Sequence, residues 1–226
     1  TMSMEPRHAE QSLIYEKTMR ERNRMLKDCV RDPSWYAAIE RQMAEAGAVI
    51  ESNRLLTVRR LQETQKGADT AFPAAELSLK AADAGAIISD RDDLLAALIE
   101  SRPRDMAAGR TLVGPHRDDL HAIYTTKGTP AKQCSTGEQK ALLVSLILAN
   151  GRALAQDFGA PPIYLLDEVA AHLDADRRAA LYDEICALGA QAWMTGTGAE
   201  LFDAMGARAM YLEVTDDAGV STVCRH

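Results

Sequence analysis

The feature that most constrains the fold is a nine-residue apolar run, residues 141–149, directly after the polar segment 135–140. Ser135 followed three residues later by Glu138 is a capping-box pattern, which predicts that a helix begins here. Apolar residues surround almost the whole helix, which indicates a buried helix rather than a half-exposed one. Its first turn contains Gly137 and would present backbone N–H groups at the positive end of the helix dipole, a phosphate-binding arrangement.

A second constraint is the apolar segment 163–166, which ends in two adjacent carboxylates, Asp167 and Glu168. The run contains no charged residue, so it predicts a central parallel strand covered on both faces. One carboxylate could hold Mg²⁺ through water and the next could orient an attacking water. The alternative, an exposed pair of loop acids, is disfavoured because apolar strands rarely end in two acids without a cation or a partner.

Composition sets the class and the charge. The 226 residues suffice for one large or two modest domains, and 46% hydrophobic with 26% charged residues predicts a soluble globular protein without a membrane-spanning segment. The net charge of -7 argues against nucleic-acid binding through overall charge. However, residues 1–66 hold 12 Lys and Arg against 10 Asp and Glu, and the remainder holds 14 against 23. The first segment is therefore the better candidate for a polyanion.

The first 66 residues predict a helical arm. One helix is expected from about His8 to Val30, and a second from Trp35 to Lys66 with Ser34 as its N-cap, because Pro33 interrupts the helical pattern. An apolar face recurs at spacings of three and four, and the two helices should form an antiparallel hairpin. The residues of this apolar face lie on the second helix and are Tyr36, Ile39, Met43, Ala46 and Ile50.

The cations of this arm allow two interpretations. They could form a solvated basic face, which is favoured because the arm also carries ten acids. They could instead contact a nucleic-acid backbone. The candidates for that role are Arg20, Arg24, Lys27, Arg54, Arg59 and Arg60.

Residues 67–110 are expected to join the arm to a head. They would comprise a linker, a strand at 75–80 and a helix from Arg91 to about Ser101 capped by Asp90. The inward residues of that helix would be Leu94, Leu95, Leu98 and Ile99.

Residues 111–226 predict an α/β lobe with a mostly parallel sheet, because strands and helices alternate. Strands are expected at 111–113, 120–124, 163–166, 191–194, 209–214 and 220–224, and helices from Thr136 to about Gln156 and from Asp174, as N-cap, to Leu188. Between the first two strands, His116 and Arg117 could form a structured turn with Arg117 paired to a neighbouring Asp, or could present a cation to nucleotide or DNA.

The chain resembles the RecF family of bacterial recombination ATPases, within the ABC-type class that includes Rad50 and SMC proteins. The resemblance extends from about Ala9 to Gly219 and rests on several motifs. These are Tyr15-Glu16-Lys17, Arg20-Glu21-Arg22-Asn23, Thr111-Leu112-Val113-Gly114-Pro115-His116-Arg117-Asp118-Asp119, Ser135-Thr136-Gly137-Glu138-Gln139-Lys140, Leu165-Leu166-Asp167-Glu168-Val169-Ala170-Ala171-His172-Leu173-Asp174 and Thr195-Gly196-Thr197.

The resemblance implies a role for each motif. Ser135, Thr136, Gly137, Glu138 and Gln139 would be the signature that closes over the γ-phosphate of ATP held by the other subunit of an ATP-dependent homodimer. Asp167 would support Mg²⁺, Glu168 would polarise the attacking water, and Asp174 would join the two sites across the dimer. Where transporter ATPases have a switch histidine, this sequence has Thr195 and Thr197, which suggests a hydroxyl sensor.

The phosphate loop of the family is missing from the sequence, since no stretch fits G-x-x-x-x-G-K-[ST]. The chain is therefore interpreted as the C-terminal half of an ABC-type ATPase head with a helical-hairpin arm, inactive by itself. The resemblance implies a cytoplasmic, nucleoid-associated protein of DNA repair, recombination, replication and the SOS response, with DNA and recombination mediator proteins as partners. Two alternatives are a transport-related ABC ATPase and a non-catalytic scaffold for DNA or a partner.

Overall fold

The computed structural model describes residues 1–68, 70–82 and 85–225. The chain divides into two compact units: unit 1 contains residues 1–67 and 75–133, and unit 2 contains residues 68–74 and 134 onward. The division falls after residue 133, whereas the sequence suggested a head beginning at residue 111. Residues 111–133 belong with the arm because their strands pair with β1 and their loop is bonded to the arm helices.

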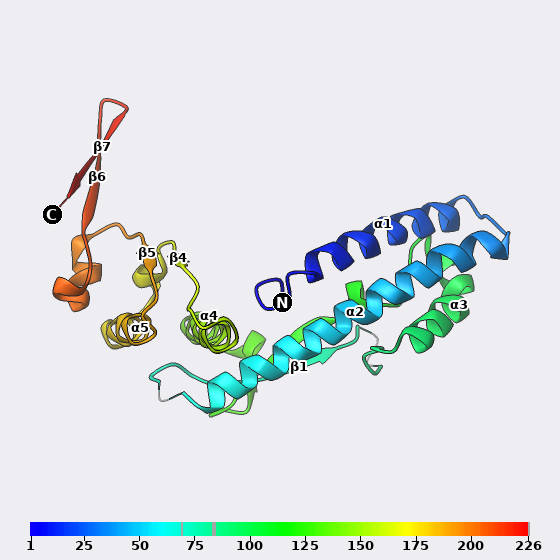
Figure 1. The fold of residues 1–226 in the computed structure, drawn as a ribbon, viewed down its shortest axis with the longest axis horizontal. Helices are drawn as coiled ribbons and strands as arrows, with labels where there is room; N and C mark the ends of the chain where they lie inside the picture. The colour runs from blue at the N-terminus through cyan, green and yellow to red at the C-terminus, as the bar shows by residue number, and fades with distance from the viewer. Residues whose placement is uncertain (69, 83–84, 226) are drawn as a thin grey trace. The chain divides into compact units, whose positions relative to one another are not determined.

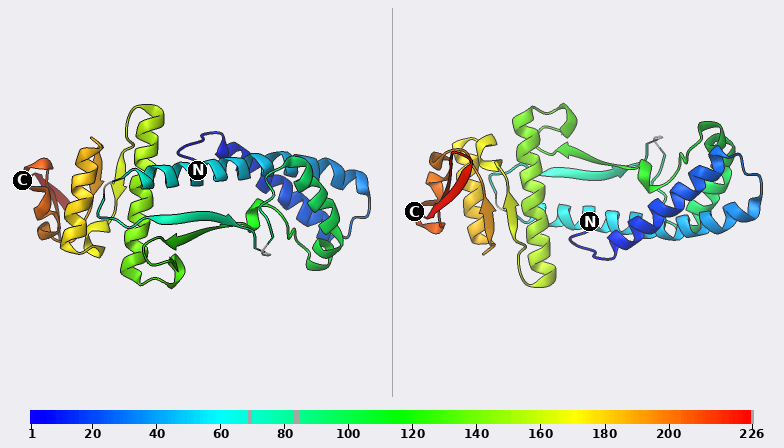
Figure 2. Two further views of the ribbon diagram at one scale, coloured as in Figure 1. Left: turned by 90° about the horizontal axis from the view of Figure 1, so that it is seen from below. Right: turned by 90° about the horizontal axis from the view of Figure 1, so that it is seen from above.

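Unit 1 is built on a helical hairpin. Its elements are α1 (His8–Lys27), α2 (Pro33–Lys66), β1 (Ala75–Lys80), α3 (Arg91–Ala108), the 3₁₀ turn η1 (Pro115–Arg117), β2 (Asp119–Tyr124), β3 (Thr129–Pro130) and the 3₁₀ turn η2 (Ala131–Gln133). The first two helices form the expected antiparallel pair (Figure 1). Side-chain contacts confirm it, since Arg22 bonds to Glu40 while His8 bonds to Asn53. The antiparallel strands β1 and β2 run beside α2 in both views of Figure 2.

The apolar core of unit 1 lies between α1, α2 and α3. Its buried residues are Tyr15, Met43, Ala44, Ala46, Ile50, Leu94 and Leu98. Gly47 allows this close packing, because a Cβ there would lie 2.6 Å from Cδ2 of Leu94.

Three expectations for unit 1 need correction. The N-cap of α2 is Asp32, whose Oδ1 accepts from the N–H of Ser34 at 2.9 Å; Ser34 itself lies within the helix. Helix α3 continues past Pro103 to Ala108 and ends where Gly109 adopts a φ of 64°. Ile99, expected to face inward, is exposed.

The predicted strand at 111–113 is also wrong. The segment has no strand conformation because side chains of the arm and of α3 satisfy its backbone. The N–H of Thr111 donates to Oδ1 of Asn23 at 2.7 Å, and the N–H of Leu112 donates to Oδ1 of Asp105 at 3.0 Å. Side-chain partners replace the strand ladder that periodicity alone would suggest.

A fully buried ionic network fixes this arrangement. The Arg22 guanidinium donates to Glu40 at 3.0 Å, Asp105 at 2.6 Å and Thr111 at 2.9 Å, and to the carbonyl of Leu98 at 2.8 Å. The side chains of Arg22, Glu40 and Asp105 have no exposed surface. Three helices and the 111–113 segment are thereby joined through one cation.

Unit 2 contains α4 (Thr136–Phe158), β4 (Tyr164–Leu166), η3 (Val169–His172), α5 (Ala175–Ala187), β5 (Ala192–Met194), η4 (Ala199–Arg208), β6 (Leu212–Asp217) and β7 (Val220–Arg225). Strands β4 and β5 are parallel. Its apolar core includes Leu148 of α4, Tyr164 and Leu166 of β4, and Leu181 and Tyr182 of α5.

The expectation of a mostly parallel sheet covered on both faces is corrected for the described residues. Only β4 and β5 pair in parallel there, while β6 and β7 form a separate antiparallel hairpin around Ala218 and Gly219, both with positive φ. Leu165 of β4 is 78% exposed and its register partner Trp193 is 57% exposed. The sheet therefore buries one face and leaves an apolar face open. Helix α4 likewise exposes Leu143, so it is buried on one side rather than all round.

Candidate nucleotide site

The acid pair lies where the two parallel strands of unit 2 end. Oγ1 of Thr195, the residue after β5, donates to Oδ1 of Asp167 at 2.6 Å and accepts from the N–H of Glu168 at 3.0 Å. The Thr195 N–H donates to the carbonyl of Leu166 at 3.1 Å and so extends the pairing of the strands. The carboxyl ends of parallel strands are where α/β proteins place ligand groups. One hydroxyl thus holds both acids at this edge.

Glu168 has an unusual backbone. Its φ of 52° lies in the left-handed region that non-glycine residues seldom adopt. The hydrogen bond from its N–H to Thr195 stabilises that conformation, and the carboxylate is exposed. Strain of this kind is concentrated at functional sites, so the backbone of Glu168 agrees with its prediction as a site residue.

The signature residues form a separate cluster at the start of α4. The predicted capping box is confirmed: Oγ of Ser135 accepts from the N–H of Glu138 at 3.4 Å, and Oε2 of Glu138 accepts from the N–H of Ser135 at 2.9 Å. Nε2 of Gln139 donates to the carbonyl of Cys134 at 2.9 Å. Thr136 and Gly137 are exposed, and the space beside Gly137 is open within 4 Å. An anion could approach this turn at Gly137.

The remaining predicted residues flank these two clusters. Asp174 is the N-cap of α5, because its Oδ1 accepts from the N–H of Arg177 at 2.9 Å. Thr197 is exposed two residues beyond Thr195. The structure therefore brings together Asp167, Glu168 and Thr195, whereas the signature residues bond among themselves.

The acid pair has the donor chemistry for Mg²⁺. Both carboxylates are exposed, and Oδ2 of Asp167 is not used in the bond to Thr195. No group of three or more His, Cys, Asp or Glu side chains suited to a metal occurs in the part of the chain that the structure describes. One or two carboxylates fit Mg²⁺ when phosphate oxygens and water complete its octahedron, and they do not fit a closed metal cage.

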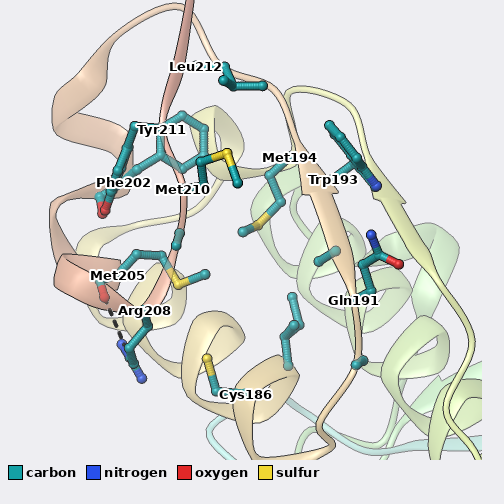
Figure 3. A pocket seen from close by; sticks show the side chains of 14 residues that line it. Cys186, Gln191, Trp193, Met194, Phe202, Met205, Arg208, Met210, Tyr211 and Leu212 are labelled. Atoms are coloured by element: carbon teal, nitrogen blue, oxygen red, sulfur yellow. Dashed lines mark hydrogen bonds between the residues drawn. The ribbon is translucent and has the colours of Figure 1, made fainter. Parts of the chain in front are cut away.

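A cavity of about 420 Å³ lies beside β5, and sequence reasoning did not anticipate it. One wall is β5 with the residues that precede it, and the opposite wall is residues 209–212, which the sequence predicted to be a strand (Figure 3). Among the described residues, β5 pairs with β4 alone, so the edge facing this cavity has no strand partner. Most of the lining is apolar and includes Met194, Met205 and Tyr211. The free edge of β5 and the apolar lining together make this cavity suited to accept a further strand.

The other sequence motif with open alternatives lies in unit 1. His116 accepts through Nδ1 from the Tyr15 hydroxyl at 2.9 Å and donates through Nε2 to the carbonyl of Thr111 at 3.1 Å; the carbonyl requires the proton on Nε2. Burial lowers the pKa of His116, which favours this neutral form. Arg117 is exposed, and within the described residues no ion pair joins it to Asp118 or Asp119. The structured-turn interpretation holds for His116 and leaves Arg117 open to solvent.

These features define a class, the ABC-type ATPase head with a helical arm. A solved structure of "the recombination mediator protein RecF-ATP in RecFOR pathway" has the same fold, with a TM-score of 0.74 at 21% identity over 97% of this chain and 59% of that chain. A second structure, of "RecF-ATPrS" in that pathway, gives a TM-score of 0.73 at 19% identity. No protein-family model matches the chain.

Curated relatives identify the family. The chain is 46% identical over 222 residues to the DNA replication and repair protein RecF of Rhizobium meliloti, and 47% identical over 221 residues to that of Mesorhizobium japonicum. These matches cover 95% and 94% of this chain. The chain belongs to the RecF family, and it spans 59% and 58% of the two relatives' lengths.

Among the described residues, none of the helices is both long and apolar enough to cross a bilayer.

Proposed function

We propose that this chain supplies the signature and acid-pair portion of a DNA-repair ATPase, which binds ATP and Mg²⁺, dimerises on ATP and acts on DNA in recombinational repair. The observation that carries the proposal is the Thr195 hydroxyl holding Asp167 and Glu168 at the end of a parallel strand pair. Membership of the RecF family supports it, because the relatives are named as DNA replication and repair proteins.

The proposed division of labour follows from the positions of the side chains. Asp167 would hold Mg²⁺, which neutralises phosphate charge when bound. Glu168 would accept a hydrogen bond from the attacking water, and Thr195 would hold the carboxylate of Asp167 and the backbone of Glu168 in place. Ser135, Thr136 and Gly137 would offer their hydroxyls and N–H groups to the γ-phosphate bound by a second copy, with Asp174 and Thr197 near that contact.

The phosphate loop must come from a further segment, and the cavity beside β5 suggests where its strand pairs. A strand inserted there would find the free edge of β5 on one side and residues 209–212 on the other. The exposed pair Leu165 and Trp193 would gain a cover from helices of the same segment, because parallel sheets are buried on both faces. About two fifths of the Rhizobium meliloti relative lies outside the part that this chain matches, and such a segment could come from there.

The test is ATP turnover after reconstitution. This chain is mixed with a separately expressed polypeptide equivalent to the part of the Rhizobium meliloti relative that it does not match. Turnover is expected in the mixture and not in the chain alone. Glu168→Gln should keep ATP-dependent association but lose turnover by about 100-fold or more, as expected for removal of a general base.

Asp176→Asn is the matched control, since Asp176 is an exposed acid on the neighbouring helix α5. It should retain turnover. Unchanged turnover in Glu168→Gln would remove Glu168 from the proposed role. Hydrolysis by the isolated chain would contradict the requirement for a further segment.

A further inference from the structure

Helix α1 has two opposite faces of different character. One face is buried and carries Tyr15, Thr18, Arg22, Met25 and Leu26. Helical geometry turns the side-chain direction by about 100° per residue, so these residues share the side of the helix that faces α2 and α3. Arg22 lies at the centre of this face.

The opposite face is a line of cations. Lys17, Arg20, Arg24 and Lys27 are all exposed and follow one another at spacings of three, four and three. By the same geometry, each lies within about 40° of the direction opposite Arg22. We call these four residues the basic ridge.

The acids of α1 lie beside the basic ridge rather than on it. Glu10, Glu16 and Glu21 are directed about 60° to 80° away from the ridge centre. Within the described part of the chain, the one ion pair of the ridge joins Arg20 to Glu16 at 3.4 Å, with both side chains largely exposed. Such a pair is weak in water and can exchange for another anion.

The buried network holds the ridge outward. Because Arg22 is bonded to Glu40, Asp105 and Thr111, α1 cannot rotate about its axis without breaking fully buried ion pairs. The positions of the ridge residues on α1 are therefore fixed relative to α2 and α3.

Two other cations of the arm, Arg54 and Arg60, differ from the basic ridge because they are bonded to partners within unit 1. Arg54 is committed to the fold: its Nη1 donates to Glu51 at 2.9 Å and to the carbonyl of Pro115 at 2.7 Å. Arg60 pairs with Glu63 at 3.4 Å. Sequence reasoning grouped both with Arg20, Arg24 and Lys27, and it did not include Lys17.

We propose that the basic ridge is the surface through which unit 1 contacts the phosphate backbone of duplex DNA. This inference rests on the proposed function, and it specifies which face meets the nucleic acid. The ridge spans ten residues, or about 15 Å. Duplex DNA carries one phosphate per about 3.4 Å of axis on each strand, so the ridge matches roughly four phosphates.

The composition of the ridge favours DNA over a protein partner. Stable protein interfaces have an apolar centre and few lysines, whereas backbone contacts on DNA come from Lys and Arg without need of an apolar centre. The contact would be independent of base sequence. The ridge also explains how a chain of net charge -7 can bind a polyanion. Its cations lie on one face of α1, and the acids of the helix lie to either side of that face.

The test is the salt dependence of duplex DNA binding, measured by fluorescence anisotropy with the full chain. The variant Arg24→Ala/Lys27→Ala should weaken binding by roughly fivefold or more and reduce the slope of log Kobs against log salt by about 2. Arg41→Ala/Arg104→Ala is the matched control, because it removes the same charge from exposed positions on α2 and α3. It should change the affinity by less than about twofold, since long-range effects are screened by salt.

Each outcome decides the proposal. Equal losses in the two double variants would show that net charge alone matters and would overturn it. Absence of DNA binding by the unchanged chain, or capture of an acidic protein with no effect of DNA, would overturn it too. The ATP turnover test does not depend on the ridge, so failure here leaves the proposed ATPase role to be judged separately. Circular dichroism should show both double variants folded, because all four substituted side chains are exposed.

Discussion

Units 1 and 2 differ in the kind of side chain that they bury. Unit 1 encloses charged groups and pairs them: Arg22, Glu40 and Asp105 are inaccessible to solvent and bonded to one another. Unit 2 has an apolar core and keeps its acids, Asp167 and Glu168, at the surface. It also leaves apolar groups open, including Leu165 and Trp193.

The difference bears on what each unit can present to a partner. Buried ion pairs add little net stability but impose one geometry, because a wrong arrangement leaves a charge without a partner. Unit 1 therefore holds a defined surface, the basic ridge. An exposed apolar sheet face beside a free strand edge favours association with another segment. The nucleotide site proposed for unit 2 would accordingly be completed by another segment.

The largest expected effect is in unit 1. Arg22→Met would leave Glu40 and Asp105 buried without their shared cation, and it should lower the stability of unit 1 by roughly 3 to 5 kcal/mol. Hydrogen exchange resolved by peptide would show the loss of protection in α1, α2 and α3. Arg20→Met, two residues away on the exposed face, is the control and should change little. Similar effects from both substitutions would refute the distinction between the two faces of α1.

The corresponding substitution in unit 2 truncates an apolar side chain of the core. Leu148→Ala removes a fully buried side chain of α4 and should cost roughly 2 to 5 kcal/mol. Leu143→Ala on the same helix should stay within about 0.5 kcal/mol, because Leu143 is exposed. Urea unfolding followed by exchange in β4 and α5 would measure both. A large loss of stability in Leu143→Ala of the isolated chain would mean that the exposed side of α4 is already covered.

The smallest effect is a pH dependence in unit 1. Burial raises the pKa of Glu51 to about 7, opposed by Arg54 and reinforced by Asp118, whose own pKa burial also raises. The folded state then binds the proton more tightly than the unfolded state, so stability should fall as pH rises from about 4.5 to 7 and level off above that. Glu51→Gln should flatten this dependence and stabilise unit 1 at pH 8 by roughly 2 kcal/mol.

Glu45→Gln is the control for that measurement, since Glu45 is exposed on the same helix. Thermal unfolding from pH 4.5 to 8.5 would separate the two variants. A slope that survives in Glu51→Gln would assign the pH dependence to another group, with Asp118 the first to test.

Local signals were sufficient for several elements. The capping box at Ser135, the N-caps Asp90 and Asp174, and the period-two strand of residues 75–80 depend on short stretches of chain, and the structure confirms them. The order of the motifs also predicted that acids follow a parallel strand. The roles of these residues in ATP hydrolysis remain predictions.

Long-range partners account for the failures. The segment 111–113 has the composition of a strand, but its N–H groups are taken by Asn23 and Asp105, 88 and 7 residues away. The exception is Ser34, where the competing group is local: Asp32, two residues earlier, accepts from the N–H of Ser34 and is the N-cap. Leu165 has the same character as its neighbours in sequence, and only the missing cover on one face shows that it is exposed.

The sequence by itself determined where most of the helices start and that the chain resembles one family, because capping, periodicity and motif order are local properties. Only the tertiary structure decided which arginines are internal and which are external. Arg20, Arg22 and Arg24 are chemically identical and two residues apart, yet one is enclosed by two carboxylates and the others face solvent. The physical reason is that burial of a cation requires partners from other helices, and their positions are set by packing rather than by the neighbouring sequence.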